Sequence, residues 1–177
     1  MQVLADFMAI YEKKGTLKGL NLAYVGDGNN NMPHSLMEGA AIMGMNMTIA
    51  SPKGYEPLEV ILKKAKIKAE QTGAAIQFTY DPVEAVTNAD IVVTDVWTSM
   101  GMEAEETERV KHFLPYQVNA KLTHHAKEDF IFLHCLPAHR GEEVTSEVID
   151  GSHSVVFDEA QNRLHAQKAV LKKLMGD

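Results

Sequence analysis

Polar and reactive side chains gather at four points of this sequence, and each point directly follows a short apolar run. The four segments are residues 26–35, 51–55, 95–101 and 134–141, which together hold asparagine, aspartate, serine, cysteine, histidine and arginine. Amide side chains can both donate and accept hydrogen bonds, which suits an amino-acid carboxylate or a carbamoyl group. We therefore expect a site for a small polar substrate where these segments meet.

Two charged residues each have two roles that the sequence leaves open. Asp95 can cap the turn that follows it, or it can hold a substrate ammonium group with Ser99 and Met100 in the same loop. Arg163 can form a surface ion pair with the acidic residues just before it, or its fork of donors can bind a phosphate or carbamoyl oxygen.

Cys135 is the only cysteine of the chain, so it cannot form an internal disulfide. It can be a small buried apolar residue, a nucleophile activated by His134, or a zinc ligand together with Asp95 and a histidine. Adjacent residues of a strand point to opposite faces, so His134 is poorly placed to activate the thiol. No C-x-x-C or H-x-x-x-H spacing supports a metal site, and we expect no metal.

The first polar segment starts as a dinucleotide-binding loop would, with Gly26-Asp27-Gly28. However, Asn31 stands where the G-x-G-x-x-G pattern needs its third glycine, and Ser51-Pro52 follow the second strand in place of a ribose-binding acidic residue. A tight strand-to-helix turn explains the first two glycines without a nucleotide. A dehydrogenase fragment is therefore the least favoured alternative, and we expect no NAD.

Short apolar runs separated by helical patterns indicate the fold. The runs are nearly continuous, which is typical of parallel strands buried on both faces. The expected strands are Asn21–Val25, Met45–Ala50, Ala75–Thr79, Asp90–Thr94, Phe130–His134 and Ser154–Phe157. Expected helices cover Val3–Tyr11, Ser35–Met43, Pro57–Thr72 with a stop at Gly73, and Ala160–Leu174. The pattern predicts one α/β domain with a doubly wound, mainly parallel, Rossmann-like sheet and helices on both faces, where ligands bind at the carboxyl ends of strands.

The composition argues against several classes of partner. The 177 residues include 17 Lys and Arg and 24 Asp and Glu, a net charge of −7, and no basic run supplies the phosphate contacts that nucleic-acid binding needs. No stretch approaches ~20 consecutive apolar residues, so we expect no membrane span. The sequence has no visible secretory signal and a single cysteine, which predicts a reducing, cytoplasmic setting.

Taken together, the polar segments resemble those of the ornithine carbamoyltransferases, over nearly the whole chain and in the same order. The D-x-x-x-S-M-G pattern at 95–101 is the ornithine-type signature within the carbamoyltransferases. The other matching segments are Gly26–Ser35, His134–Pro137 with Arg140–Thr145, and Phe157–His165.

The resemblance implies how ornithine would be held. Asp95 would bind the α-ammonium, while Ser99 and the backbone of Met100 would hold the amino-acid end. Asn31 or Asn30 would bind the carboxylate. The choice between the two stays open because this chain has three asparagines where many relatives have two.

The resemblance also implies the reaction, in which a neutral δ-amine of L-ornithine attacks carbamoyl phosphate to give citrulline and phosphate without a cofactor. Cys135 would lie beside the amine without acting as a nucleophile. The Leu136 carbonyl would lie near the carbamoyl nitrogen, and Arg163 would contact carbamoyl phosphate.

In this family an N-terminal domain carries the S-T-R-T-R and H-P-x-Q motifs, which this sequence lacks, although Gln2 resembles the last residue of H-P-x-Q. Residues 1–177 would then be the C-terminal, ornithine-binding domain, inactive or nearly so without the carbamoyl-phosphate domain. The two end helices carry apolar stripes that can cap the sheet, dock on the other domain or pair with another copy, so we expect a homo-oligomer. The alternative is a non-catalytic amino-acid-binding module that retains the ornithine half-site.

Overall fold

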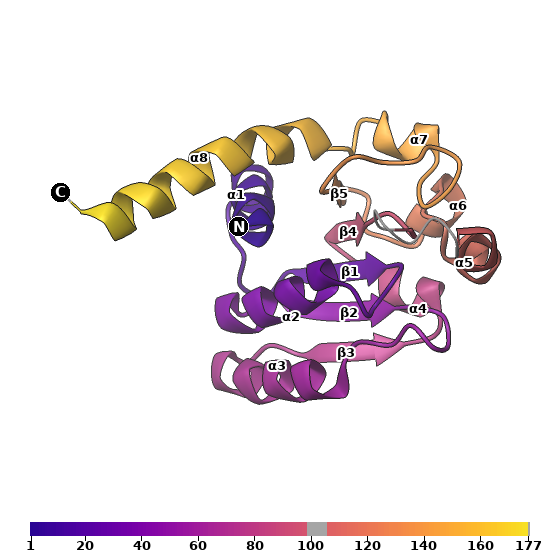
Figure 1. The fold of residues 1–177 in the computed structure, drawn as a ribbon, viewed down its shortest axis with the longest axis horizontal. Helices are drawn as coiled ribbons and strands as arrows, with labels where there is room; N and C mark the ends of the chain where they lie inside the picture. Colours follow the sequence, from indigo (N-terminus) through magenta and orange to yellow (C-terminus); the bar gives the residue numbers. More distant parts are fainter. Residues whose placement is uncertain (99–105, 177) are drawn as a thin grey trace.

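The computed structural model describes residues 1–98 and 106–176, in which strands alternate with helices (Figure 1). The strands are β1 (Asn21–Val25), β2 (Asn46–Ala50), β3 (Ile76–Thr79), β4 (Ile91–Thr94) and β5 (Ile131–His134). The helices are α1 (Gln2–Lys14), α2 (Asn31–Met43), α3 (Glu59–Thr72), α4 (Pro82–Val86), α5 (Glu106–Phe113), the 3-10 helix η2 (Leu114–Tyr116), α6 (Ala120–Thr123), α7 (Ser146–Ile149) and α8 (Val156–Met175).

The five strands form one parallel sheet in the order β3-β2-β1-β4-β5. The chain builds outward from β1 to β3 and then returns to the other side of β1 for β4 and β5. A reversal of this kind opens a crevice at the carboxyl ends of the two central strands. Asn30 follows β1 and Asp95 follows β4, so the reversal brings these two predicted site residues to the same crevice.

The two faces of the sheet carry separate apolar cores, as the predicted helices on both faces require. Leu22 and Tyr24 of β1 pack with residues of α1, α2 and α3, whereas Ala23 and Val25 pack with residues of α4, α6 and α7. This alternation follows from the two-residue period of a strand. The doubly wound α/β fold is thus confirmed.

Local signals explain most helix boundaries. Asn30 caps α2 by accepting a hydrogen bond from the Met32 backbone N–H at 3.2 Å, so the helix begins four residues before the predicted Ser35. Gly73 ends α3 in the left-handed conformation at φ 77°, which confirms the predicted stop. The short helices α4 to α7 fall outside the expected elements, because four to eight residues carry too little apolar periodicity.

One predicted strand is wrong. Ser154–Phe157 leads into α8, and Ser154 makes an isolated bridge with Phe132 of β5. Val155 and Val156 enter the two different cores, while Phe157 is 72% exposed. The run is apolar because it anchors the start of α8 beside β5, not because a strand is covered on both faces.

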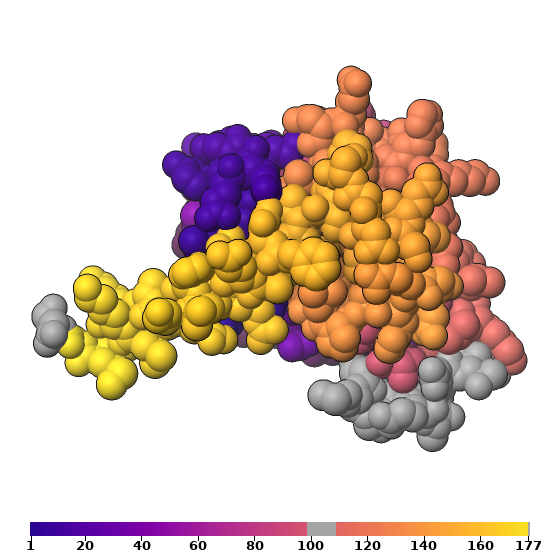
Figure 2. All heavy atoms as spheres, turned by 90° about the horizontal axis from the view of Figure 1, so that it is seen from above, coloured from indigo at the N-terminus to yellow at the C-terminus, as the bar shows by residue number. Residues whose placement is uncertain are grey.

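The two end helices pack against each other. Asn162 of α8 donates a hydrogen bond to Glu12 of α1 at 2.8 Å, and Lys13 pairs with Asp158 at 2.6 Å. α8 lies across α1 and its later turns extend away from the rest of the chain (Figures 1 and 2). In the described part of the chain, no helix has the length and apolar character that crossing a membrane requires.

Candidate functional site

Three of the predicted site residues form one hydrogen-bonded chain at the switch point. The Cys135 thiol donates to Asp95 Oδ1 at 3.2 Å, and the Val96 backbone N–H donates to the same oxygen at 2.8 Å. Asn30 Nδ2 lies 3.5 Å from Asp95 Oδ2, at the long limit of a hydrogen bond. Because Asn30 Oδ1 accepts from the Met32 N–H, its amide nitrogen must face Asp95.

The surroundings of Cys135 keep its thiol protonated. Burial raises the pKa of Cys135 far above its usual range, and the negative charge of Asp95 and the hydrogen bond to it raise the pKa further. A thiol with a raised pKa holds its proton at neutral pH and is a weak nucleophile. The side chain is therefore suited to donating a hydrogen bond.

His134 takes no part in activating Cys135. Its Nδ1 accepts a hydrogen bond from the Leu136 backbone N–H at 2.9 Å, so the proton lies on Nε2, 3.2 Å from the buried Glu143. Both ring nitrogens are thus engaged within the loop after β5, so neither is free to take the proton of the thiol. This agrees with the expectation from strand alternation.

The same engagement argues against zinc at this point. Ligand atoms of Asp95, His134 and Cys135 lie within 4.8 Å of one another. However, both nitrogens of His134 already have partners, and the protonated thiol of Cys135 is directed at Asp95. A zinc ion needs a free imidazole nitrogen and a thiolate, which this donor set does not offer.

The loop after β1 is also unsuited to a dinucleotide. A side-chain carbon at Gly28 would lie 2.7 Å from Ser51 Oγ, 2.7 Å from the Tyr55 carbonyl and 2.8 Å from Pro57. Gly28 is thus needed for close packing against the loop after β2. Packing of the chain against itself therefore accounts for this glycine without a nucleotide.

A hollow of about 770 Å³ joins the loop after β5 to α8. Cys135, Leu136 and Arg163 line it, so Cys135 belongs both to this hollow and to the chain with Asp95. Arg163 is exposed there, and the carboxylates predicted to pair with it have other partners, since Asp158 binds Lys13 and Glu159 is buried.

The remaining predicted site residues lie farther from Asp95 or fall outside the described residues. Asn31 is the first residue of α2 and is exposed, so Asn30 is the asparagine that reaches Asp95. Ser99 and Met100 lie outside the described residues. Trp97 is 1% exposed and stacks on Phe113, so it belongs to the core and not to the substrate-facing surface of the site.

A buried ion pair joins α5 to the loop after β1 and could not be predicted from the sequence. Arg109 of α5 donates to Asp27 in the loop after β1, although 82 residues separate them. Its Nε also donates to the Trp97 carbonyl at 2.6 Å. Asp27 alone suggests a turn residue and Arg109 a solvated helix residue, so no local pattern indicates the pair.

A second buried cluster lies between α1, α8 and β5. The Gln2 amide donates to Asp6 Oδ1 and to Glu159 Oε1, both at 2.7 Å, and Glu159 Oε2 accepts from the His134 backbone N–H at 3.0 Å. Asp6 and Glu159 are each 1% exposed. Burial raises the pKa of Asp6 to about 6 and of Glu159 to about 9, so the two carboxyl groups together hold one proton at neutral pH.

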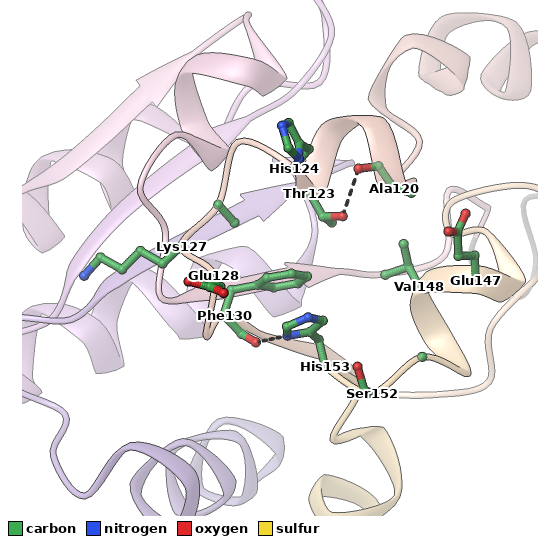
Figure 3. A pocket seen from close by; sticks show the side chains of 12 residues that line it. Ala120, Thr123, His124, Lys127, Glu128, Phe130, Glu147, Val148, Ser152 and His153 are labelled. Atoms are coloured by element: carbon green, nitrogen blue, oxygen red, sulfur yellow. Dashed lines mark hydrogen bonds between the residues drawn. The ribbon is translucent and has the colours of Figure 1, made fainter.

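A further hollow of about 560 Å³ lies at the opposite, amino end of β5 (Figure 3). Its floor includes Phe130, whose carbonyl accepts a hydrogen bond from Nδ1 of His153 at 2.8 Å, with the two rings stacked. His124 is exposed at its rim. The predicted site residues lie at the other end of the strand.

Fold and site together define a doubly wound α/β domain with a polar crevice at its switch point. The family described as "Aspartate/ornithine carbamoyltransferase, Asp/Orn binding domain" matches residues 18–174, and the chain belongs to this family. The resemblance inferred from the motifs is thereby confirmed.

Named relatives agree. The chain is 63% identical over 175 residues to an ornithine carbamoyltransferase of Carboxydothermus hydrogenoformans, covering 99% of this chain and 56% of that protein. The Bacillus subtilis ornithine carbamoyltransferase is 59% identical, covering 98% of this chain and 54% of that protein. The solved ornithine carbamoyltransferase of Pyrococcus furiosus superposes with a TM-score of 0.92 at 56% identity, covering 96% of this chain and 54% of that one. The chain thus spans about half the length of the relatives it matches.

Proposed function

We propose that this chain is the ornithine-binding half of an ornithine carbamoyltransferase. The observation that carries the proposal is the chain of Asn30, Asp95 and a protonated Cys135 at the switch point of the sheet. An α-amino acid presents an ammonium and a carboxylate next to each other. Asp95 offers a carboxylate for the ammonium, and the Asn30 amide with the positive end of α2 offers donors for the carboxylate.

Cys135 then lies where the ornithine side chain would reach past Asp95 towards the hollow lined by Leu136 and Arg163. The uncharged δ-amine forms a bond to the carbamoyl carbon, the bond from that carbon to the phosphate oxygen breaks, and the amine loses a proton. The protonated thiol orients the reacting groups by hydrogen bonding. Arg163 supplies positive charge for the phosphate.

The whole reaction needs more donors than this half provides. Stabilising a transferring group on a dianion takes several preorganised cationic or N–H donors, each worth about 3 kcal/mol in the transition state. In the part of the chain that the structure describes, Arg163 is the arginine that lines the hollow without a carboxylate partner, since Arg140 is held by both oxygens of Asp150. We propose that a carbamoyl-phosphate-binding half supplies the remaining donors.

A complementation assay tests this division. The chain alone, mixed with L-ornithine and carbamoyl phosphate, should produce no citrulline above the uncatalysed level. Co-expression with the other half of the Bacillus subtilis ornithine carbamoyltransferase should restore citrulline formation, and an Asp95→Asn variant should not. Citrulline formation at an ordinary enzymatic rate by the chain alone would refute the division. Ornithine binding without any restoration would favour a non-catalytic amino-acid-binding module.

We also propose a homo-oligomer, supported by the exposed leucines of α8, and a cytoplasmic setting, supported by the single free thiol, that of the half-buried Cys135.

A further inference from the structure

Arg109 joins four separate segments around the site. Its guanidinium donates to the Asp27 carboxylate after β1 and to the Trp97 carbonyl after β4. It also lies over the rings of Tyr55, after β2, and Phe113, at the end of α5, at 4.9 and 5.3 Å from their centroids. The side chain is almost completely buried, at 6% exposed for the residue, which is rare for arginine unless it is paired.

The two hydrogen-bonded partners of Arg109 each lie within three residues of a proposed ligand-binding residue. Asp27 Oδ1 accepts from the Asn29 backbone N–H at 2.9 Å, and Asn29 directly precedes Asn30. Trp97 follows Asp95 by two residues. A single guanidinium therefore links the loop that carries Asn30 to the loop that carries Asp95, where Asn30 Nδ2 lies 3.5 Å from Asp95 Oδ2.

We propose that Arg109, through its pair with Asp27, is a positioning residue that holds the loops after β1 and β4 at the spacing an α-amino acid requires. Arg109 acts through Asp27 and Trp97 and does not itself contact the ligand. The planar fork of arginine suits this role because it donates in two directions while its face stacks on an aromatic ring. The inference rests on the proposed assignment of Asn30 and Asp95 to the amino-acid end of ornithine.

A matched pair of variants separates positioning from general stability. Arg109→Met keeps an unbranched apolar side chain but removes the guanidinium with its charge and its donors. Lys127→Met breaks another ion pair, at the amino end of the sheet, where buried Asp90 accepts from Lys127 Nζ at 2.7 Å and from the Asn21 N–H at 2.9 Å and the lysine side chain is partly exposed. L-ornithine and L-norvaline, which share the amino-acid end and differ at the δ-amine, serve as ligands in NMR titrations.

Arg109→Met should weaken both ligands at least tenfold and shift the free protein's amide resonances of Asn30 and Val96. Lys127→Met should leave the affinities within twofold and those resonances in place. Arg109→Lys keeps the charge but loses the fork of donors that reaches both the Asp27 carboxylate and the Trp97 carbonyl, and it should weaken binding three- to tenfold. This variant provides the test if the methionine variant does not fold. Unchanged resonances and affinities in the Arg109 variants, or equal losses in Lys127→Met, would overturn positioning. If the parent chain binds neither ligand, the proposed function fails, whereas the resonances of the free protein still decide the role of Arg109.

Discussion

At the scale of single residues, the protonation of Cys135 decides which chemistry the crevice can perform. A thiolate would attack an electrophile, whereas the thiol seen here donates to Asp95. Burial is the largest cause of the raised pKa and Asp95 the next. The two residues therefore act as one unit, and changing Asp95 should change the reactivity of the cysteine.

Alkylation of Cys135 tests this coupling. Iodoacetamide should modify the parent chain very slowly at pH 8, because few molecules carry a thiolate. Asp95→Asn should speed the reaction severalfold, because it removes the neighbouring negative charge that raises the Cys135 pKa. Mass spectrometry of the modified fraction over time measures both rates. Glu59→Gln, an exposed substitution on α3, serves as the control and should react like the parent.

Asp95→Asn should also weaken L-ornithine binding. A hydrogen bond to a charged group contributes about 1.5–3 kcal/mol, which corresponds to about ten- to a hundredfold in affinity. Titration calorimetry of folded protein measures the loss, and again Glu59→Gln should bind like the parent. An affinity within twofold of the parent would mean that Asp95 does not hold the ammonium group.

The residues that follow the strand ends could be predicted from the sequence, whereas the residues that hold those loops in place could not. Asn30, Asp95 and Cys135 could be foreseen to converge, because an apolar run followed by polar residues marks a carboxyl end of a parallel strand. The choice of Asn30 over Asn31 needed the helix start, since only the structure places Asn30 as the cap of α2. Arg109 could not be foreseen, because its partner Asp27 lies 82 residues away.

At the scale of elements, two buried carboxyl groups join α1, α8 and β5. The Gln2 amide donates to both Asp6 and Glu159, which brings the two buried carboxyl groups close together. Their pKa values are raised to about 6 and about 9 from ordinary values of 3.8 and 4.5. A raised folded pKa means that the stabilisation is complete below the unfolded value and is lost as the pH rises through the folded value.

We therefore expect the free energy of unfolding to fall as the pH rises from 6 to 9. The slope is at most about 1.4 kcal/mol per pH unit for each proton released. Asp6→Asn should flatten this slope, because an amide can donate to Glu159 without adding a negative charge. Urea unfolding at pH 6, 7, 8 and 9 provides the measurement.

Asp129→Asn is the matched control for that series. Asp129 is exposed and pairs with Lys14 of α1, the helix that also carries Asp6. The pKa of Asp129 is lowered, so this carboxyl group does not titrate above pH 6. The control should keep the slope of the parent. Identical slopes in Asp6→Asn and the parent would mean that the buried pair does not hold a shared proton.

The strands could be predicted from their apolar runs, whereas the apolar segment that fixes the start of α8 was mistaken for a strand. Five apolar runs became the five strands, because a parallel strand covered on both faces has nearly no polar positions. The sixth run, Ser154–Phe157, has the same composition but begins α8, and its two valines fill different cores. Composition alone cannot tell these two reasons for an apolar run apart.

At the scale of the whole molecule, the chain corresponds to about half of its relatives and leaves α8 partly uncovered. Leu171, Leu174 and Met175 are 56%, 78% and 80% exposed on the part of α8 that extends past the rest of the chain (Figure 2). Contiguous exposed apolar side chains commonly mark interaction surfaces.

We expect these residues to drive self-association of the isolated chain. Sedimentation velocity over a range of concentrations should reveal oligomers, and Leu171→Gln combined with Leu174→Gln should shift the distribution towards monomer. Val60→Gln, an exposed apolar change on α3, should not. A monomer at every concentration would contradict self-association.

We propose above all that the crevice between β1 and β4 binds the amino-acid end of ornithine. An amide-resolved NMR titration with L-ornithine tests it most directly, because NMR detects millimolar binding, or about 4 kcal/mol. Putrescine, which lacks the carboxylate, and NAD are the control ligands. We expect saturable shifts at Asn30, Asp95 and Cys135 with L-ornithine, weaker shifts with putrescine and none with NAD. Unmoved resonances at millimolar L-ornithine, or equal shifts with NAD, would contradict it.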